Sequence, residues 1–385
     1  MNNTLPELSI GSVKNILGVK GKAPYIFQYS NRYSVFDWGA MPDDIPNKGR
    51  ALAVMANAFF KLVEKPARWK ELFEHWPHLK SSFSDDLIFE LTMFGLKHHS
   101  RGPYHSDGTA NKEDKLFDCI GVNPFNVLRP QQGQDGPNYS AYRERPANTL
   151  IPLEAIFRFG VPTGSSLPER SGDMAYRECL GLQNVAREGD VFERPLIEFS
   201  TKLEALDRYL YPSEALEISG LSPKEYVRLR SIISLLSYLL KYNFEKVGIT
   251  LWDGKFEFAF GRKMDGEREI VLIDSIGPDE LRLSCEGVQL SKEVLRKFYR
   301  ASEWFQAVKV AKQMLVRKEI SQDDWQDYVA IKMNSPAPHL PKDMIDIVDH
   351  MYMALANAVL HMIEQEPVFV CMELPEVVSK LREHL

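Results

Sequence analysis

The nine residues Trp252-Asp253-Gly254-Lys255-Phe256-Glu257-Phe258-Ala259-Phe260 decide how the middle of this chain folds. Side chains alternate between the two faces of a β-strand. The three phenylalanines therefore share one face, and the charged residues Asp253, Lys255 and Glu257 share the other. This pattern predicts a strand with an apolar face toward a core and a row of charges on its opposite face.

The residues that follow predict a hairpin. Asp265 and Gly266 form the favoured pair for a two-residue turn, and an apolar run, Ile270-Val271-Leu272-Ile273, returns before Asp274. If Asp265 and Gly266 are the two loop residues, opposed positions can be counted outward from them. Glu257 is then predicted to face Asp274 directly.

Two carboxylates on adjacent strands repel each other unless a positive group lies between them. A hard divalent cation bound by carboxylate oxygens, with water and phosphate completing its shell, removes this conflict. Glu257 and Asp274 are therefore candidate Mg²⁺ ligands. The alternative is a solvent-facing hairpin whose carboxylates point into water, and spacing alone favours neither interpretation.

Two loops are candidate anion sites. Asn31–Asp37 and then Ile45-Pro46-Asn47-Lys48-Gly49 precede a helical pattern, and N–H groups at a helix start attract phosphate or carboxylate. Arg158 is followed by Thr163-Gly164-Ser165-Ser166, which combines a guanidinium fork with hydroxyl and backbone donors. An ordinary loop remains an alternative explanation for both patterns.

The composition excludes several classes of protein. The 385 residues are 44% hydrophobic and 26% charged, with a formal net charge of −6, which is typical of a globular protein without a basic nucleic-acid-binding field. The four cysteines form no CxxC pair, and neither a membrane span nor a signal peptide is indicated. We expect a cytoplasmic protein that binds neither nucleic acid nor membranes. Whether it forms a homo-oligomer is left open by the sequence.

The chain is predicted to divide into three parts. Residues 1–127 form an N-terminal domain, 128–290 a central domain, and 291–385 a set of C-terminal helices packed on the central domain. This division rests on changes in periodicity along the chain.

Apolar periodicity and turn residues predict the elements within these parts. We expect a small antiparallel sheet over 10–37 that includes Tyr33–Phe36, a helix after Gly49, a crossover strand at 126–129, a strand at 153–159, a hairpin at 248–274, and helices over 291–316 and 342–364. Surface loops are expected at 100–118 and 130–149. Histidines before the first loop, His98, His99 and His105, are expected at the surface.

Taken in order, six motifs resemble those of the SAICAR synthetase family, from about Gly11 to Arg300. They are Gly11-Ser12-Val13-Lys14, Asn31 to Asp37, Ile45 to Gly49, Leu153 to Arg158 with Thr163-Gly164-Ser165, Ser200 to Glu204, and Asp253-x-Lys255-x-Glu257 with Asp274. No single motif is decisive, but six in the right order are specific.

The resemblance implies an α+β fold of two domains, a small antiparallel-sheet domain and a larger sheet-and-helix domain, with ATP in the cleft. It would make residues 1–127 an ATP-covering domain and residues 128–290 the domain that binds substrate and metal. It also implies an ATP- and Mg²⁺-dependent ligase of purine biosynthesis that joins carboxyaminoimidazole ribonucleotide to L-aspartate. A carboxylate is a poor acyl donor, so an acyl-phosphate intermediate is expected. Catalysis would then consist mostly of positioning and charge stabilisation.

The resemblance assigns roles to individual residues. The implied catalytic residues are Lys255, Asp253 and Asp207. The implied nucleotide-binding residues are Lys14, Leu128, Arg129, Lys202, Glu257 and Asp274, of which the last two also bind Mg²⁺. The implied substrate-binding residues are Asn31, Arg32, Ser34, Asp37, Lys48, Arg158, Gly164, Ser165 and Arg282.

Three positions depart from the family pattern. Ser12 stands where Lys is usual, Asn31 replaces Asp, and Ser275 follows the metal aspartate where an acid is common. These departures leave three alternatives open: an amide ligase for another acid or amine, a small-molecule kinase that uses the same carboxylates, and a nucleotide-binding paralogue without turnover.

Overall fold

The computed structural model describes residues 4–133, 136–204, 207–321 and 324–384. Contacts group the chain into two compact units, each built from separate segments. Unit 1 contains Met1–Asn57, Arg101–Val122 and Ser284–Leu385, and unit 2 contains Ala58–Ser100 and Asn123–Leu283. This grouping differs from the predicted division at residues 127 and 290. Among the described residues, no helix is long and apolar enough to cross a membrane.

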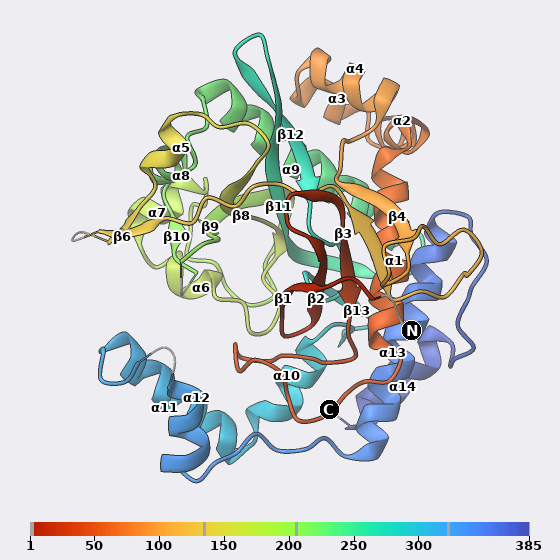
Figure 1. Cartoon of the computed structure of the whole chain (residues 1–385), viewed down its shortest axis with the longest axis vertical. Helices are drawn as coiled ribbons and strands as arrows, with labels where there is room; N and C mark the ends of the chain where they lie inside the picture. Colours follow the sequence, from red (N-terminus) through yellow and green to blue (C-terminus); the bar gives the residue numbers. More distant parts are fainter. Residues whose placement is uncertain (1–3, 134–135, 205–206, 322–323, 385) are drawn as a thin grey trace. The chain divides into compact units, whose positions relative to one another are not determined.

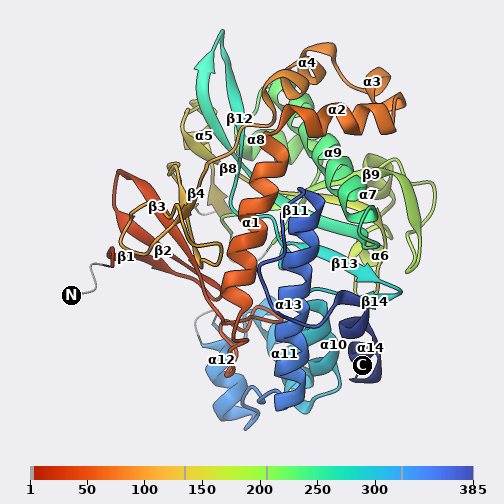
Figure 2. The same cartoon turned by 90° about the vertical axis from the view of Figure 1, so that its right-hand side faces the viewer.

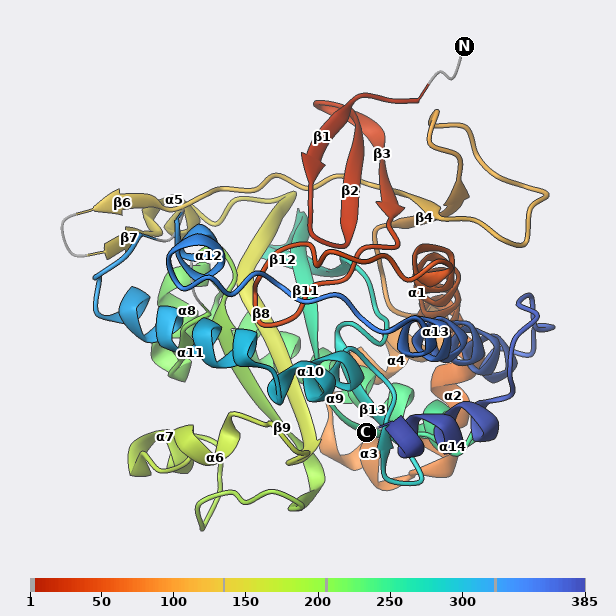
Figure 3. The same cartoon turned by 90° about the horizontal axis from the view of Figure 1, so that it is seen from below.

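Unit 1 contains an antiparallel sheet, as predicted for residues 10–37. Its strands follow the order β1-β2-β3-β5-β4, and Figure 3 shows the first three side by side. Their bounds are β1 (Glu7–Ile10), β2 (Lys14–Val19), β3 (Lys22–Tyr29), β5 (Cys119–Val122) and β4 (Ser100–Tyr104), of which Ser100 belongs to unit 2. The strand predicted at Tyr33–Phe36 is wrong. Phe36 and Asp37 adopt left-handed backbone angles, φ 54° and 58°, which turn the chain instead.

The C-terminal helices belong to unit 1. They are α10 (Glu293–Arg300), α11 (Glu303–Val316), α12 (Trp325–Asp327), the π-helix η1 (Tyr328–Lys332), α13 (Lys342–Met362) and α14 (Leu374–His384), after the short strand β14 (Val288–Gln289). The helix predicted at 291–316 is two helices, because Ser302 caps a new start by accepting a hydrogen bond from Phe305 N. The helix predicted at 342–364 is confirmed as α13.

Long-range contacts hold the C-terminal helices to the N-terminal segment of unit 1. The hydroxyls of Tyr33 and Tyr299 are 2.7 Å apart and both side chains are buried. Asp349 of α13 accepts hydrogen bonds from the backbone N–H and side-chain amide of Asn47, at 2.7 and 2.8 Å. Figure 2 shows α13 beside the start of α1 (Lys48–Glu64), which begins in unit 1 and ends in unit 2.

Unit 2 is built on a second antiparallel sheet (Figure 1). Its strands follow the order β10-β9-β8-β11-β13, and β12 also pairs with β11. The bounds are β8 (Thr149–Gly160), β9 (Val191–Thr201), β10 (Tyr209–Leu210), β11 (Thr250–Met264), β12 (Glu267–Ile273) and β13 (Leu281–Cys285), whose last two residues belong to unit 1. The strand predicted at 153–159 and the hairpin predicted at 248–274 are confirmed.

One face of this sheet is the apolar core of unit 2. Phe256, Phe258 and Phe260 are buried as the alternation predicts, and Phe256 stacks on Phe157 of β8 at 4.8 Å. The long helix α9 (Pro223–Glu245) covers this face, begins at a Ser222–Glu225 capping box, and places Tyr238 edge-on to Phe159. The remaining helices of unit 2 are α2 (Pro66–His75), α3 (His78–Ser82), α4 (Asp85–Phe94), α5 (Ser140–Arg143), α6 (Leu167–Arg170), α7 (Met174–Cys179) and α8 (Pro212–Ser219).

The predicted loops and crossover strand need correction. Residues 100–118 include β4, and residues 130–149 include α5 and the small hairpin of β6 (Gln131–Gly133) and β7 (Gly136–Asn138). Residues 126–129 form no strand, because only Asn126 makes a ladder contact, an isolated bridge to Thr149. For the strands, backbone pairing with a neighbouring segment decides the structure, and local composition does not indicate it.

Candidate active site

The face of the unit 2 sheet opposite the phenylalanines carries a patch of charge. Strand pairing sets Glu154 of β8 opposite Glu257 of β11 and opposite Ser200 of β9, while Arg158 lies opposite Asp253. Alternation then places nine residues on this site face: Glu154, Ile156, Arg158, Glu198, Ser200, Lys202, Asp253, Lys255 and Glu257. The predicted row of charges, on β11, is therefore one edge of a three-strand array whose middle strand is β8.

The predicted register of the hairpin is wrong by one residue at the site. Asp265 and Gly266, at φ 49° and 85°, form the expected two-residue turn, and Lys263 pairs with Arg268 as counted. The ladder then shifts between Phe260 and Lys263, so Glu257 pairs with Ile273 and not with Asp274. A bulge of this kind adds a residue to one strand and re-aims the side chains beyond it. Asp274 follows directly after the strand end.

Glu154 holds two lysines on the site face. One oxygen, Oε1, accepts hydrogen bonds from Lys255 Nζ at 2.8 Å and from Lys202 Nζ at 3.2 Å. Lys202 also donates to Glu257 Oε1 at 2.6 Å. Burial alone would raise the pKa of Glu154, but the two ammonium groups lower it below its usual range. Glu154 is therefore ionised at neutral pH.

Glu257 and Asp274 form a pair of carboxylates whose negative charges repel each other. Burial first, and the charge of Asp274 second, raise the pKa of Glu257 to about 7, although Lys202 opposes the shift. Asp274 has a left-handed backbone, φ 60°, which is uncommon outside glycine and is found at functional sites. Its carbonyl oxygen lies 3.1 Å from Nε2 of His99. His99 was expected at the surface but is 4% exposed, because it supports this strained residue.

Arg158 anchors a second cluster on the same face. Its guanidinium donates to Glu198, to Asp253 Oδ2 at 2.6 Å and to Tyr209 Oη at 3.3 Å. Arg282 Nη1 lies 3.5 Å from the same oxygen of Asp253. Arg158 is thus held in place by two buried carboxylates. Its guanidinium is less available to bind a phosphate than the sequence predicted.

Glu198 connects this cluster to the segment after β8. Besides Arg158, it accepts hydrogen bonds from Arg170 Nη2 and from Tyr176 Oη, each at 2.8 Å. Arg170 also lies over the ring of Tyr209, 3.3 Å from its centroid. The side chain of Glu198 is fully buried, and its role is to fix helices α6 and α7 against the sheet.

The sequence model of SAICAR synthetase matches residues 7–101 and 137–311. This chain belongs to the SAICAR synthetase family. A protein of Archaeoglobus fulgidus, named as a candidate phosphoribosylaminoimidazole-succinocarboxamide synthase, is 34% identical over 98% of this chain and 100% of its own length. The Thermoplasma volcanium enzyme of that name is 29% identical over 76% of this chain and 83% of its own.

A solved SAICAR synthase structure shows the same fold. The protein from Saccharomyces cerevisiae, solved in complex with SAICAR, covers 94% of this chain and 96% of its own with a TM-score of 0.52 at 19% identity. The predicted family and the α+β class with antiparallel sheets are therefore confirmed. The charged array of unit 2 is formed by residues within the part of the chain that the SAICAR synthetase model matches.

The Glu257–Asp274 pair is suited to a magnesium ion that takes only two of its ligands from the protein. Across the described residues, no group of three or more His, Cys, Asp or Glu side chains is placed to hold a metal. Mg²⁺ commonly uses one or two carboxylates and takes its other ligands from water and phosphate. Glu257 and Asp274 supply such a pair, and the raised pKa of Glu257 shows that a positive charge would stabilise it.

In unit 1, residues of the family motifs form hydrogen bonds and packing contacts with other residues of the chain. Asp349 accepts from Asn47 N, and Asn31 Oδ1 accepts from Gly49 N at 3.1 Å. The N–H groups that were expected to attract an anion at the start of α1 therefore already have partners. Lys48 is fully buried, 5.2 Å above the ring of Tyr352.

Other predicted residues of unit 1 also have protein contacts. Arg32 donates to Gly11 O at 2.9 Å and to Asn15 Oδ1 at 2.6 Å. Asp37 accepts from Lys312 at 2.5 Å, while Ser34 is half-buried. Lys14 Nζ lies 4.3 Å above the ring of Phe27. Their predicted roles toward ligands stay predictions.

Five predicted residues of unit 2 are not among the residues of the charged array described above. Leu128 is half-buried and Arg129 exposed. Gly164, at φ 78°, is exposed, and Ser165 Oγ accepts from Leu167 N at 3.3 Å. Asp207 is exposed and follows residues 205–206, which are outside the described ranges. Their roles stay predictions too.

Sequence reasoning missed Glu154, Glu198, Arg170, Tyr176 and His99. Glu154 and Glu198 could have been found, because alternation along β8 and β9 places them on the face of Arg158 and Lys202. Arg170, Tyr176 and His99 come from other segments, and no local pattern connects them to the site.

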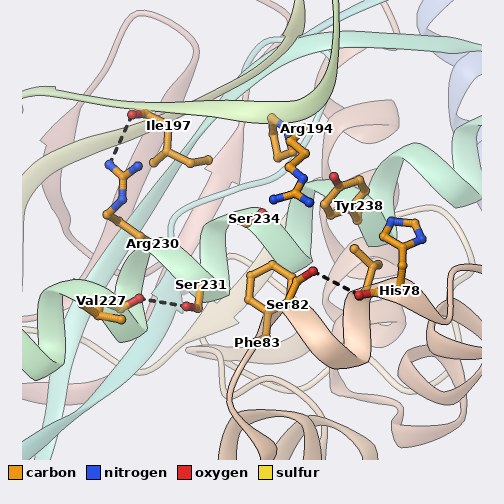
Figure 4. A pocket seen from close by; sticks show the side chains of 12 residues that line it. His78, Ser82, Phe83, Arg194, Ile197, Val227, Arg230, Ser231, Ser234 and Tyr238 are labelled. Atoms are coloured by element: carbon orange, nitrogen blue, oxygen red, sulfur yellow. Dashed lines mark hydrogen bonds between the residues drawn. The ribbon is translucent and has the colours of Figure 1, made fainter. Parts of the chain in front are cut away.

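A surface cavity of about 320 Å³ lies on the other face of the unit 2 sheet. It is lined by α3, α9 and the start of β9, where Arg230 donates to Ile197 O at 3.4 Å (Figure 4). Ile197 precedes Glu198, so their side chains point to opposite faces. The cavity is lined by none of the predicted site residues.

Proposed function

We propose that this chain is a SAICAR-forming ligase. It joins the carboxylate of carboxyaminoimidazole ribonucleotide to the amine of L-aspartate, and ATP becomes ADP and phosphate. The observation that carries this proposal is the array of lysines and carboxylates on one sheet face, within the residues that the SAICAR synthetase model matches. The predicted cytoplasmic location suits substrates of this kind.

The charges of the array suit a phosphoryl-transfer site. Lys255 and Lys202 lie among three carboxylates, Glu154, Glu257 and Asp274, so the ionised group carries one more negative than positive charge. A magnesium ion would be held by Glu257 and Asp274 and would offset charge on the nucleotide's phosphates. ATP itself would bind with help from the predicted residues Lys14, Leu128 and Arg129.

The reaction proceeds in two steps. The substrate carboxylate attacks the γ-phosphorus, the bond to the β,γ-bridging oxygen breaks, and an acyl phosphate and ADP result. The aspartate amine then attacks the acyl carbon, phosphate leaves, and the amine proton is released. Lys255 and Lys202 stabilise charge on the moving phosphoryl oxygens, and Glu154 holds both ammonium groups in place. No enzyme nucleophile is required.

The test measures ADP and SAICAR formation with Mg²⁺-ATP and carboxyaminoimidazole ribonucleotide, with and without L-aspartate. Wild type should need both substrates, and Asp274→Asn should lose at least 100-fold in kcat. Asp265→Asn is the matched control, because Asn tolerates the left-handed angle of this turn residue. ADP release without aspartate would indicate a kinase, and no turnover with any of these substrates would contradict the ligase assignment.

A further inference from the structure

Glu154 occupies an unusual position in the charged array. It is 4% exposed, it lies directly opposite Glu257 across the β8–β11 pair, and a single oxygen accepts from both Lys255 and Lys202. A buried carboxylate with two ammonium partners has its charge fully compensated. Its charge is therefore balanced by lysines of the site alone.

Lys202 is shared between two competing carboxylates. Its ammonium lies 2.6 Å from Glu257 and 3.2 Å from Glu154, and it also interacts with the charge of Asp274. The pull of Glu154 limits how far Lys202 neutralises the Glu257–Asp274 pair. The closer Lys202 moves to that pair, the less negative charge remains there for a divalent cation.

We propose that Glu154 is a positioning residue. It holds Lys255 and Lys202 where they face nucleotide phosphates, and it keeps Lys202 from neutralising the Glu257–Asp274 pair, which stays negative for a divalent cation. This inference rests on the proposed function, because it assumes that magnesium and nucleotide phosphates meet at this array. It assigns to Glu154 no contact with the reacting atoms.

The consequence is a pair of effects with opposite signs. Glu154→Gln keeps the side chain's shape but removes one negative charge, so Lys202 is released toward Glu257 and Asp274. Divalent cation should then bind more weakly, because a neighbouring negative charge is lost. Nucleotide phosphates should bind as well or better without metal, because two lysines are less compensated. General damage to the fold would weaken both.

The experiment measures two affinities at pH 8, where the carboxylates are ionised. Mn²⁺ binding to protein saturated with ADP is followed by electron paramagnetic resonance, and ADP binding in EDTA by calorimetry. For Glu154→Gln we expect a rise of about tenfold in the Mn²⁺ dissociation constant and no loss of metal-free ADP affinity. Glu154→Asp keeps the charge and should restore much of the Mn²⁺ affinity.

The control is Glu269→Gln on β12, because Glu269 pairs with Lys97 at the surface of the same sheet. It should leave both affinities unchanged. An unchanged Mn²⁺ affinity in Glu154→Gln, or a parallel loss of Mn²⁺ and ADP, would overturn the inference about Glu154. Wild-type protein that binds neither ADP nor Mn²⁺ would instead contradict the proposed function.

Discussion

The charged face of unit 2 and the start of α1 in unit 1 were both predicted to bind ligands. They differ in how far their polar and charged groups are already satisfied by other groups of the protein. At the start of α1, Asp349 and Asn31 already occupy the backbone donors. On the unit 2 face, Glu257 and Asp274 repel each other, and the pKa of Glu257 is raised to about 7. We therefore expect unbalanced charge on the sheet to be a better sign of a ligand than the loop motif.

The largest effect is expected at a buried ion pair of unit 2 in which the opposite charges are balanced. Arg268 contacts Glu225 through Nε at 2.9 Å and Nη2 at 2.7 Å, and both side chains are buried. Arg268→Leu should lower the free energy of unfolding by about 3–5 kcal/mol, because buried Glu225 keeps only its ion pair with the half-buried Arg145. Urea denaturation measures this. The kcat of the folded fraction should stay near wild type, and a large loss of kcat would mean that balanced pairs also serve the site.

The next largest effect is expected at Lys202. Lys202→Met should lower kcat by about 10²–10³-fold, because the phosphoryl oxygens lose a half-buried cation. Lys97→Met, which removes a surface lysine of the same unit, is the control for steady-state assays. A Lys202 variant with wild-type turnover would show that the charged face is structural.

Asp349 tests the other side of the comparison. Asp349→Asn weakens the two hydrogen bonds to Asn47 and should cost about 1–3 kcal/mol of stability, measured by thermal unfolding. The KM values of all three substrates should not change. A tenfold rise in any KM would restore the predicted ligand role of the start of α1, including Asn31 and Lys48.

The smallest effect is a pH dependence. Under the proposal that ionised Glu257 binds Mg²⁺, kcat/KM should fall by about tenfold per pH unit below about 7. The same raised pKa means that this group stabilises the fold fully below its unfolded pKa, near 4.5, and that this contribution is lost as pH rises through about 7. Mg²⁺ should restore stability at pH 8. A flat pH–rate profile from 6 to 8 would count against an ionising Glu257.

The parts of the fold that depend on local pattern could be predicted from the sequence. Alternation at 252–260 indicated both faces of β11, and Asp265-Gly266 indicated the turn. The shift between Phe260 and Lys263 could not be predicted, because a bulge depends on how the strand twists against its neighbours.

The rest of the site depends on contacts between distant segments. Asp349 meets Asn47 from 302 residues away, and Arg170 and Tyr176 reach Glu198 from helices outside the sheet. Single-sequence patterns carry no information on such pairs. The family motifs indicated candidate site residues, but not which partner each one has.

The interleaving of the two units also limits how this protein can be cut or shortened. Unit 1 draws on three separate stretches of chain and unit 2 on two, so neither can be produced as one continuous fragment. A gene truncated before residue 291 would encode the whole charged face, yet it would lack Tyr299 and Asp349, which hold the first segment of unit 1 in place. Deletion of the last quarter of the chain should therefore unfold its beginning.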